Sequence, residues 1–218
     1  MKLLALATVL LMSAGLKSAT MAQEKSADGF VSLFDGKTLD GWKANEEDKE
    51  KKIFSVQDGE LVVKGGRAHL FYQGKDGKAT FTNFVYKAKV LTKPNANSGL
   101  YIHTEYQASD WPKKGYECQV NNSFDKDPRK TGSLYAVLDF KEKIVPDNEW
   151  FDYEVTVEGK HIVIKINGKV TADYTEKEGD PRQGGMEGRW LKGGTFAIQA
   201  HDPGCEVHYK DIKVKVLP

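Results

Sequence analysis

The feature of this 218-residue chain that most limits its fold is a series of short alternating apolar and polar runs that continues to the last residue. Gly, Asn, Asp and Pro separate the runs, and no stretch repeats its apolar residues at helical spacing. Alternation places every second side chain on one face of a strand. The sequence therefore predicts an all-β protein, whose clearest strands cover residues 83–91, 98–103, 115–121, 150–158, 161–166, 195–201 and 206–216.

Local signals indicate how these strands pair. The alternating run 161–166 ends at Asn167-Gly168, the favoured pair for a two-residue hairpin turn. In residues 206–216 the apolar parity changes near Lys210, which predicts a β-bulge there. Together with fainter strands earlier in the chain, the pattern predicts two packed antiparallel sheets in a jelly-roll sandwich.

The N-terminus has the features of a secretory signal peptide. Lys2 precedes an apolar run over residues 3–12, and small residues follow around Ala19 and Ala22. The run is too short to span a bilayer. We expect residues 1–22 to be removed by cleavage after Ala22, with cleavage after Ala19 as the weaker alternative, and the mature protein to be periplasmic or secreted.

Residues 23–218 are enough for one substantial core, so a single domain is expected. The formal charge of the whole chain is +1, without blocks of either sign, which makes nucleic acid and anionic membranes poor partners. The two cysteines, Cys118 and Cys205, have the parity of inward-facing strand residues. A disulfide between them and a pair of buried thiols are both open from the sequence.

Three strands present polar side chains opposite their apolar residues. These side chains are Tyr101 and His103, Glu117, Gln119 and Asn121, and Gln199 and His201. Adjoining strands would gather them on one concave surface. Amides and carboxylates make paired hydrogen bonds to vicinal hydroxyls, and an aromatic ring such as Tyr101 or Trp111 covers the apolar face of a sugar. The set therefore indicates carbohydrate binding.

A polar outer face on an antiparallel sheet is ordinarily just a solvated surface. Solvated strand faces favour Lys, Thr and Glu, as at Lys213 and Lys215. Glu, Gln, Asn, His and Tyr together are less typical of solvation. The composition of the three strands taken together therefore favours a binding site.

Three long connections, at residues 104–114, 122–132 and 175–194, are of a length that is usually functional in a compact domain. The last contains Arg189 and Trp190. We expect Arg189 to contact a ligand and Trp190 to anchor the loop.

Several segments in the right order resemble one family. They are F30-V-S-L-F-D-G-K-T-L-D-G-W42, N97-S-G-L-Y-I-H-T104, G115-Y-E-C-Q-V-N-N122, T131-G-S-L-Y135, N148-E-W150, I166-N-G-K169, and G194-T-F-A-I-Q-A-H-D-P-G-C205 with Y209-K-D-I-K-V-K-V-L-P218. The chain resembles the 3-keto-disaccharide hydrolase domain family over nearly all of residues 23–218. The resemblance implies a concanavalin A-like or laminin G-like sandwich and cleavage of 3-keto glycosides, in some members by elimination to a keto-glucal and hydration.

The residues themselves disfavour an ordinary retaining glycosidase, which needs two carboxylates. Glu117 is followed on its face by Gln119 and Asn121, neither of which ionises. A 3-keto sugar needs a base, an acid and an enolate stabiliser. We expect Glu117 or His201 to act as the base and His103 as the acid. Substrate-binding residues are expected at Tyr101, Gln119, Asn121, Trp111, His69, Gln199 and Arg189.

Other interpretations remain. His103, Glu117 and His201 would together suit a divalent metal, but no short His-x-His pair supports this, so no cofactor is expected. A non-catalytic carbohydrate-binding module is the alternative function, because this fold supports it equally well. A structural adhesion domain would instead require an exposed apolar patch.

Overall fold

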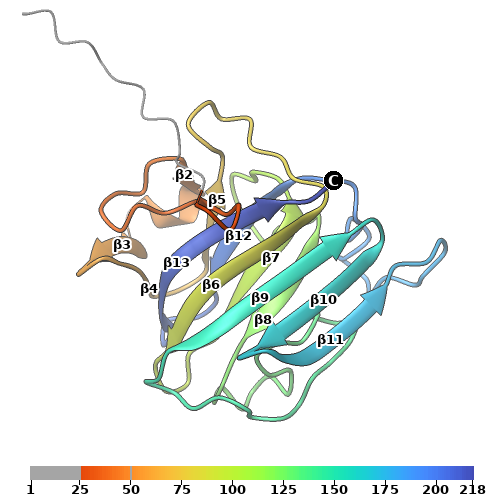
Figure 1. Cartoon of the computed structure of the whole chain (residues 1–218). Helices are drawn as coiled ribbons and strands as arrows, with labels where there is room; N and C mark the ends of the chain where they lie inside the picture. Colours follow the sequence, from red (N-terminus) through yellow and green to blue (C-terminus); the bar gives the residue numbers. More distant parts are fainter. Residues whose placement is uncertain (1–25, 50) are drawn as a thin grey trace, which may run out of the picture.

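The structure, a computed structural model, describes residues 26–49 and 51–218 as two layers of β-strands (Figure 1). The expected signal peptide and its cleavage site lie outside the described residues. The elements are β1 (Val31–Ser32), β2 (Trp42–Ala44), the 3₁₀ turn η1 (Glu46–Asp48), β3 (Phe54–Gln57), β4 (Glu60–Lys64), β5 (Ala68–Tyr72), β6 (Phe84–Thr92), β7 (Ser98–Thr104), β8 (Tyr116–Val120), β9 (Phe151–Glu158), β10 (His161–Ile166), β11 (Lys169–Thr175), β12 (Thr195–Ala200) and β13 (Glu206–Val216).

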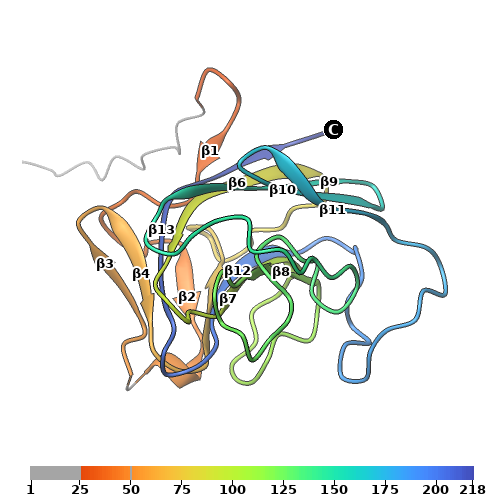
Figure 2. The same ribbon diagram turned by 90° about the horizontal axis from the view of Figure 1, so that it is seen from below.

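The strands form two antiparallel sheets that face each other (Figure 2). The larger sheet has the order β11-β10-β9-β6-β13-β4-β3, with β1 paired to β13, and the smaller has the order β2-β5-β12-β7-β8. The expected all-β, two-sheet sandwich is confirmed. Among the described residues, no helix has the length and apolar character needed to cross a membrane.

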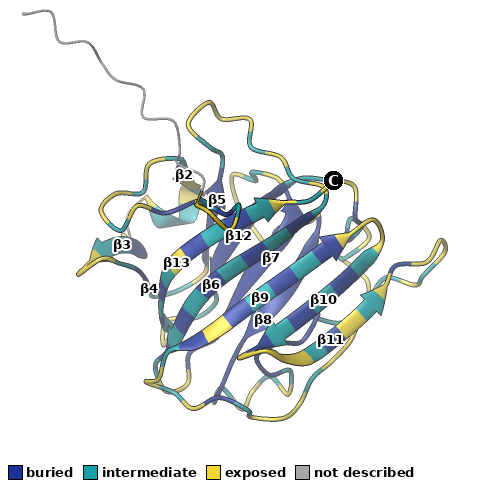
Figure 3. Cartoon of the chain, viewed as in Figure 1, coloured by how far each residue is buried: buried dark blue, intermediate teal, exposed yellow. Residues whose placement is uncertain are grey.

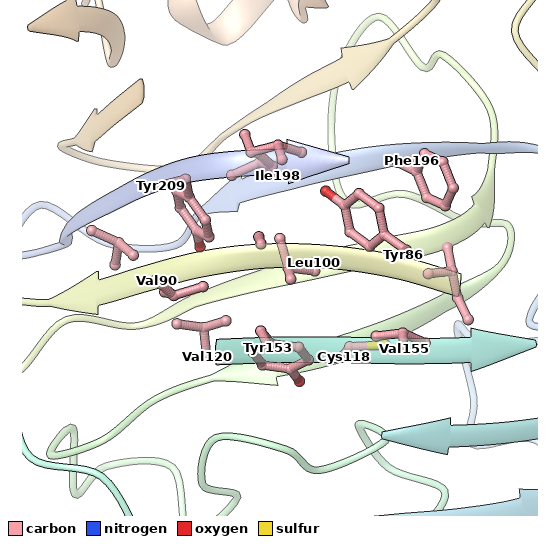
Figure 4. Close-up of a cluster of buried hydrophobic side chains, with 14 of the residues drawn as sticks. Tyr86, Val90, Leu100, Cys118, Val120, Tyr153, Val155, Phe196, Ile198 and Tyr209 are labelled. Atoms are coloured by element: carbon pink, nitrogen blue, oxygen red, sulfur yellow. The ribbon is translucent and has the colours of Figure 1, made fainter. Parts of the chain in front are cut away.

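The hydrophobic core fills the space between the sheets, because alternate strand residues point inward. Every second residue of β6 and β9 is buried (Figure 3). Tyr86 from the larger sheet stacks on Phe196 from the smaller one, with ring centroids 4.3 Å apart (Figure 4). Cys118 and Cys205 are both buried and free, and burial raises the pKa of the Cys205 thiol to about 12. Buried thiols are thus the observed outcome.

Both local backbone predictions are confirmed. Asn167 and Gly168 join β10 to β11 with φ angles of 48° and 79°, as a hairpin turn with two left-handed residues requires. In β13, the pairing with β6 shifts register between Lys210 and Lys213. Asp211, between them, has φ of 52° and marks the bulge.

The two sheets differ in how their second faces are covered. In the larger sheet, buried residues alternate with more exposed ones, as in β10. All residues of β5, β7, β8 and β12 in the smaller sheet are buried. Long connections, including the one between β11 and β12, cover the face that points away from the core (Figure 2). The covered polar face of the smaller sheet is therefore the expected position of a binding site.

Candidate functional site

The covered face of the smaller sheet contains a pocket of about 270 Å³. Three strands supply its floor. Glu117 on β8 pairs in register with Tyr101 on β7, and Tyr101 pairs with Ala197 on β12. Gln199 follows two residues after Ala197 and therefore lies on the same face of β12. The lining side chains and glycines are Asn97, Tyr101, Trp111, Pro112, Glu117, Gln119, Tyr135, Gly184, Gly185, Met186, Arg189, Gln199 and His201. Glu117 and His201 thus share one hollow, as predicted.

The carboxylate of Glu117 is held by three donors. Oε2 accepts hydrogen bonds from the Tyr101 hydroxyl at 2.9 Å and from Arg189 Nη2 at 3.4 Å, and Oε1 accepts from Gln199 Nε2 at 3.1 Å. The side chain is 6% exposed. Because a buried carboxylate loses its solvation, the guanidinium and the two neutral donors supply the compensation that burial requires.

A missing side chain makes room for this carboxylate. Gly99 lies between Gln119 and Gln199 in the sheet register. A Cβ atom at Gly99 would come within 2.8 Å of Oε1 and 3.0 Å of Cγ of Glu117. Glycine at this position therefore lets the Glu117 side chain lie across β7.

Arg189 reaches the pocket from the long loop between β11 and β12. Its Nη1 donates to the backbone oxygen of Tyr135 at 2.9 Å, and its own backbone oxygen accepts from Arg182 Nε at 2.7 Å. Arg182 also donates to the Tyr116 hydroxyl at 3.0 Å and stacks 3.8 Å from the centroid of the Trp190 ring. Arg189 therefore lines the pocket, and its contact with a ligand stays a prediction. Trp190 contacts Arg182 and Glu187, both in its own loop, so its role as an anchor to the sandwich also stays a prediction.

The other end of the loop is anchored by Glu176. Its carboxylate accepts hydrogen bonds from the Tyr116 hydroxyl at 2.6 Å, Lys160 Nζ at 2.5 Å and the Leu191 backbone at 2.8 Å. Burial alone would raise the pKa of Glu176, but these hydrogen bonds outweigh burial and lower it. The loop that carries Arg189 is therefore fixed by ionic contacts behind the pocket.

Gln119 lies beside the carboxylate. In one orientation its amide donates to Asn97 Oδ1 at 3.2 Å, and in the reversed orientation it donates to Glu117 Oε1 at 3.2 Å. Either arrangement keeps a polar amide at the pocket wall, where it was predicted.

Trp111 and His201 form an aromatic wall. Their ring centroids are 5.1 Å apart, and Trp111 is 36% exposed and lines the pocket. His201 Nδ1 lies 3.4 Å from Oδ2 of Asp202. On its other side, Trp111 contacts His69 edge-on, with centroids 5.5 Å apart. His69 is fully buried on β5, directly paired with Gln199 in the sheet register.

The expectation that His103 shares this surface is wrong. Between Tyr101 and Thr104, β7 has one residue more than β12, and His103 has φ of 51°, so the bulge turns its ring away. His103 Nε2 lies 2.9 Å from the Thr82 oxygen, and Nδ1 accepts from the Gly193 backbone at 3.2 Å. Burial lowers the pKa of His103, which suits this neutral, structural imidazole.

The expectation for Asn121 is also wrong. β8 ends at Val120, and Asn121 begins the following loop. Its Nδ2 donates to the backbone oxygens of Phe124, Asp127 and Arg129, and its Oδ1 accepts from the Phe124 backbone. The amide is used to shape the loop and does not line the pocket.

The suggested metal set of His103, Glu117 and His201 is not assembled, because His103 faces elsewhere. Within residues 26–49 and 51–218, no group of three or more His, Cys, Asp or Glu side chains is placed to hold a metal ion. Sequence reasoning overlooked Asn97, Tyr135 and Met186 as lining residues. Asn97 and Tyr135 both fall in segments that carry the family resemblance, which was the signal available for them.

The sequence of the chain is similar to those of known proteins. The sequence profile of the 3-keto-alpha-glucoside-1,2-lyase-like domain matches residues 29–215. A 3-keto-disaccharide hydrolase of Bacteroides thetaiotaomicron is 28% identical, over 94% of this chain and 85% of the relative.

Among solved structures, a Parabacteroides distasonis protein assigned as a glycosyl hydrolase superposes with a TM-score of 0.74 at 24% identity, over 91% of this chain and 98% of that one. A carbohydrate-binding module of Bacillus subtilis gives 0.56 at 13% identity, over 80% and 95%. These structural likenesses show the fold. From the profile match, the chain belongs to the 3-keto-alpha-glucoside-1,2-lyase-like domain family.

Proposed function

We propose that the pocket cleaves a glycoside bearing a 3-keto group, by elimination across carbons 1 and 2 followed by hydration. Family membership supports glycoside cleavage, and the Bacteroides relative supports a keto sugar as the substrate. One observation carries the proposal: Glu117 is a buried carboxylate with three donors, and the lining residues within the described chain include no second carboxylate.

A single carboxylate favours a reaction in which the substrate supplies part of the activation. Retaining glycosidases place two carboxyl groups about 5–5.5 Å apart, one as nucleophile and one as acid and base. In a 3-keto sugar, the carbonyl acidifies the hydrogen on carbon 2, so loss of that proton drives out the group on carbon 1. One positioned base is then sufficient to begin cleavage.

Glu117 takes the proton from carbon 2, the bond from carbon 1 to the glycosidic oxygen breaks, and His201 gives a proton to the departing oxygen. Water then adds across the new double bond: His201 takes a proton from the water as the hydroxyl bonds to carbon 1, and Glu117 returns its proton to carbon 2, which restores both side chains. The sum is one glycoside and one water giving a keto sugar and a free alcohol. Each positioned proton transfer contributes roughly 10²–10⁴ in rate.

Arg189 and Tyr101 supply the stabilisation of the enolate oxygen. Burial, followed by the neighbouring Glu117, raises the pKa of Tyr101 well above its usual value, so its phenol keeps its proton and remains a donor. Arg189 has a permanent charge and is 5% exposed, and a preorganised cation in a water-poor site stabilises a developing anion strongly. Gln119 and the Nε2 amide of Gln199 orient the keto sugar.

Residues 1–22 are proposed as a cleaved signal peptide and residues 23–218 as one periplasmic or secreted domain, from the charge, apolar run and small residues of the leader. N-terminal sequencing of protein exported with its own leader tests this. A mature chain beginning at Gln23 supports it, and a retained Met1 contradicts it.

The experiment for the activity uses methyl 3-keto-glucoside. Wild-type protein is expected to convert the glycoside into 3-keto-glucose and methanol, while Glu117→Gln and His201→Ala lose about 10²-fold or more in turnover. Full turnover by both variants would contradict the assignment of residues. Binding of the sugar without methanol release would support the carbohydrate-binding module instead.

A further inference from the structure

Unsatisfied polar atoms gather at one corner beside the pocket, where His69 lies behind the lining residues. Both ring nitrogens of His69 and the Oε1 atom of Gln199 are buried without a hydrogen-bond partner. The two residues are directly paired across β5 and β12, and they lie on the covered face of the sheet. Burying polar groups without partners is costly, and natural proteins rarely leave several together without a reason.

The catalytic end of the pocket is different. Glu117, Tyr101 and Arg189 all have hydrogen-bond partners within the protein. Gln199 spans the two regions, because its Nε2 donates to Tyr101 and Glu117 while its Oε1 has no partner. His201 Nδ1 is also buried without a partner, so the unmet hydrogen-bonding capacity lies at Gln199, His69 and His201 and not at the Glu117 carboxylate.

Trp111 covers this corner. Its indole contacts the rings of His69 and His201 and lies 5.5 Å from the Arg67 guanidinium, and among the described residues no hydrogen bond holds the indole itself. The backbone is fixed separately, because Gln107 donates to the Trp111 oxygen at 2.9 Å. The described contacts of the side chain are ring and cation contacts alone, and rotation of the indole about this fixed backbone would uncover His69.

We infer that His69 and the Oε1 atom of Gln199 form a second subsite, covered by Trp111, that binds hydroxyl groups of the leaving-group sugar of a 3-keto disaccharide. This inference rests on the proposed function, in which His201 protonates the departing oxygen. His201 contacts Trp111, and Trp111 contacts His69, so the corner lies beyond the acid, where the leaving group must be.

The chemistry of the corner matches hydroxyl groups. Burial lowers the pKa of His69 to about 3, so its ring is neutral and offers one donor and one acceptor. Gln199 Oε1 adds an acceptor. A pair of sugar hydroxyls both donates and accepts and satisfies all three atoms, while the Trp111 ring covers the apolar face of the sugar.

The first test measures the wild type and His69→Phe on two keto glycosides. The leaving group is glucose in one and nitrophenol in the other. The ratio of kcat/KM for the disaccharide to that for the aryl glucoside is expected to fall about tenfold in the variant, the loss of one or two hydrogen bonds. His161→Phe, at an exposed histidine on β10 paired with Asp173, is the matched control and should keep the wild-type ratio. An unchanged ratio in His69→Phe overturns the subsite.

Stability gives a second readout. Because the His69 ring has no partner to lose, His69→Phe is expected to melt at or above the wild-type Tm. A clearly lower Tm would mean that a buried water already satisfies the imidazole, and would overturn the inference.

A third readout does not depend on turnover. Glucose, the free leaving group, is expected to shift the His69 ring resonances of the wild type in NMR titrations and to bind the variant more weakly. If the wild type leaves both keto glycosides intact, the proposed function fails, and this titration alone decides the subsite: the glucose-dependent shift supports it, and its absence overturns it.

Discussion

The outer faces of the two sheets are both polar, but they differ in how far their side chains are exposed to solvent. On the larger sheet, Lys87 pairs with Glu154 at 2.8 Å and Lys89 with Asp152 at 2.9 Å, and these side chains remain partly in water. On the smaller sheet, Glu117 is 6% exposed and lies within a network of buried donors. The difference comes from the long loops that cover the outer face of the smaller sheet (Figure 2).

The same strand alternation thus produces either a solvated surface or a buried polar one, depending on whether loops cover the face. Ion pairs in water contribute about 0–1 kcal/mol, because both charges are well solvated before they pair. A covered charge has lost its solvation and depends on its partners. Substitutions on the two faces should therefore have very different effects.

The largest effect is expected from Arg189→Met, which leaves the buried carboxylate of Glu117 without its cation. We expect the free energy of unfolding to fall by about 3 kcal/mol, together with a large loss of kcat/KM on a 3-keto glycoside. Urea denaturation and initial rates measure the two. Lys87→Met, which breaks an ion pair on the solvated face, is the matched control. Equal stability losses in the two variants would remove the contrast between the faces.

A smaller effect is expected from Gly99→Ala, whose Cβ would meet the Glu117 carboxylate. Displacement of a catalytic group by about 1 Å can cost 10²-fold, so kcat/KM is expected to fall 10- to 100-fold. The free energy of unfolding should change by less than about 1 kcal/mol. Gly66→Ala, where a Cβ meets no atom within 4 Å, should retain activity. Wild-type rates in Gly99→Ala would show that the position of Glu117 does not matter.

Glu176 makes the stability of the loop over the smaller sheet depend on pH. Its folded-state pKa is lowered, so its contribution to stability is complete above the unfolded value and is lost as the pH falls through the folded one. We expect Glu176→Gln to lower the free energy of unfolding by about 1–3 kcal/mol at pH 7, and the gap from wild type to shrink below about pH 4. Denaturation at pH 7 and pH 3 measures it. A gap that stays constant with pH would contradict the ionic anchoring of the loop.

The smallest effect is expected for the exposed pair of Lys89 and Asp152. A double-mutant cycle of Lys89→Met and Asp152→Asn should give a coupling energy below about 1 kcal/mol that decreases further in salt. Turnover should be unchanged. A coupling of several kcal/mol would show that this face, too, stores electrostatic energy.

Strand parity was sufficient to place most of the site. Tyr101, Glu117, Gln119 and Gln199 were expected on one surface and lie there, because their strands run without interruption through these positions. The choice of residue types, with amides and a carboxylate in place of lysines, also indicated which outer face carries the pocket.

Parity failed where the backbone departs from regular strand geometry. His103 sits at a bulge between two close approaches of the chain, where a Cβ at Gly115 or at Gly194 would come within 2.6 Å of the His103 carbonyl carbon. Those glycines were visible in the sequence, but the strand that each would cross was not. The prediction for Asn121 was wrong because β8 ends one residue earlier than expected, and the side chain of a loop residue is not assigned to either face of the sheet by strand alternation.

The most direct measurement compares the rates of wild-type protein on a 3-keto glycoside with hydrogen or deuterium at carbon 2. If Glu117 removes that hydrogen as the carbon–oxygen bond breaks, the deuterated sugar reacts several-fold more slowly. Equal rates, with turnover that survives in Glu117→Gln, would contradict elimination from this pocket.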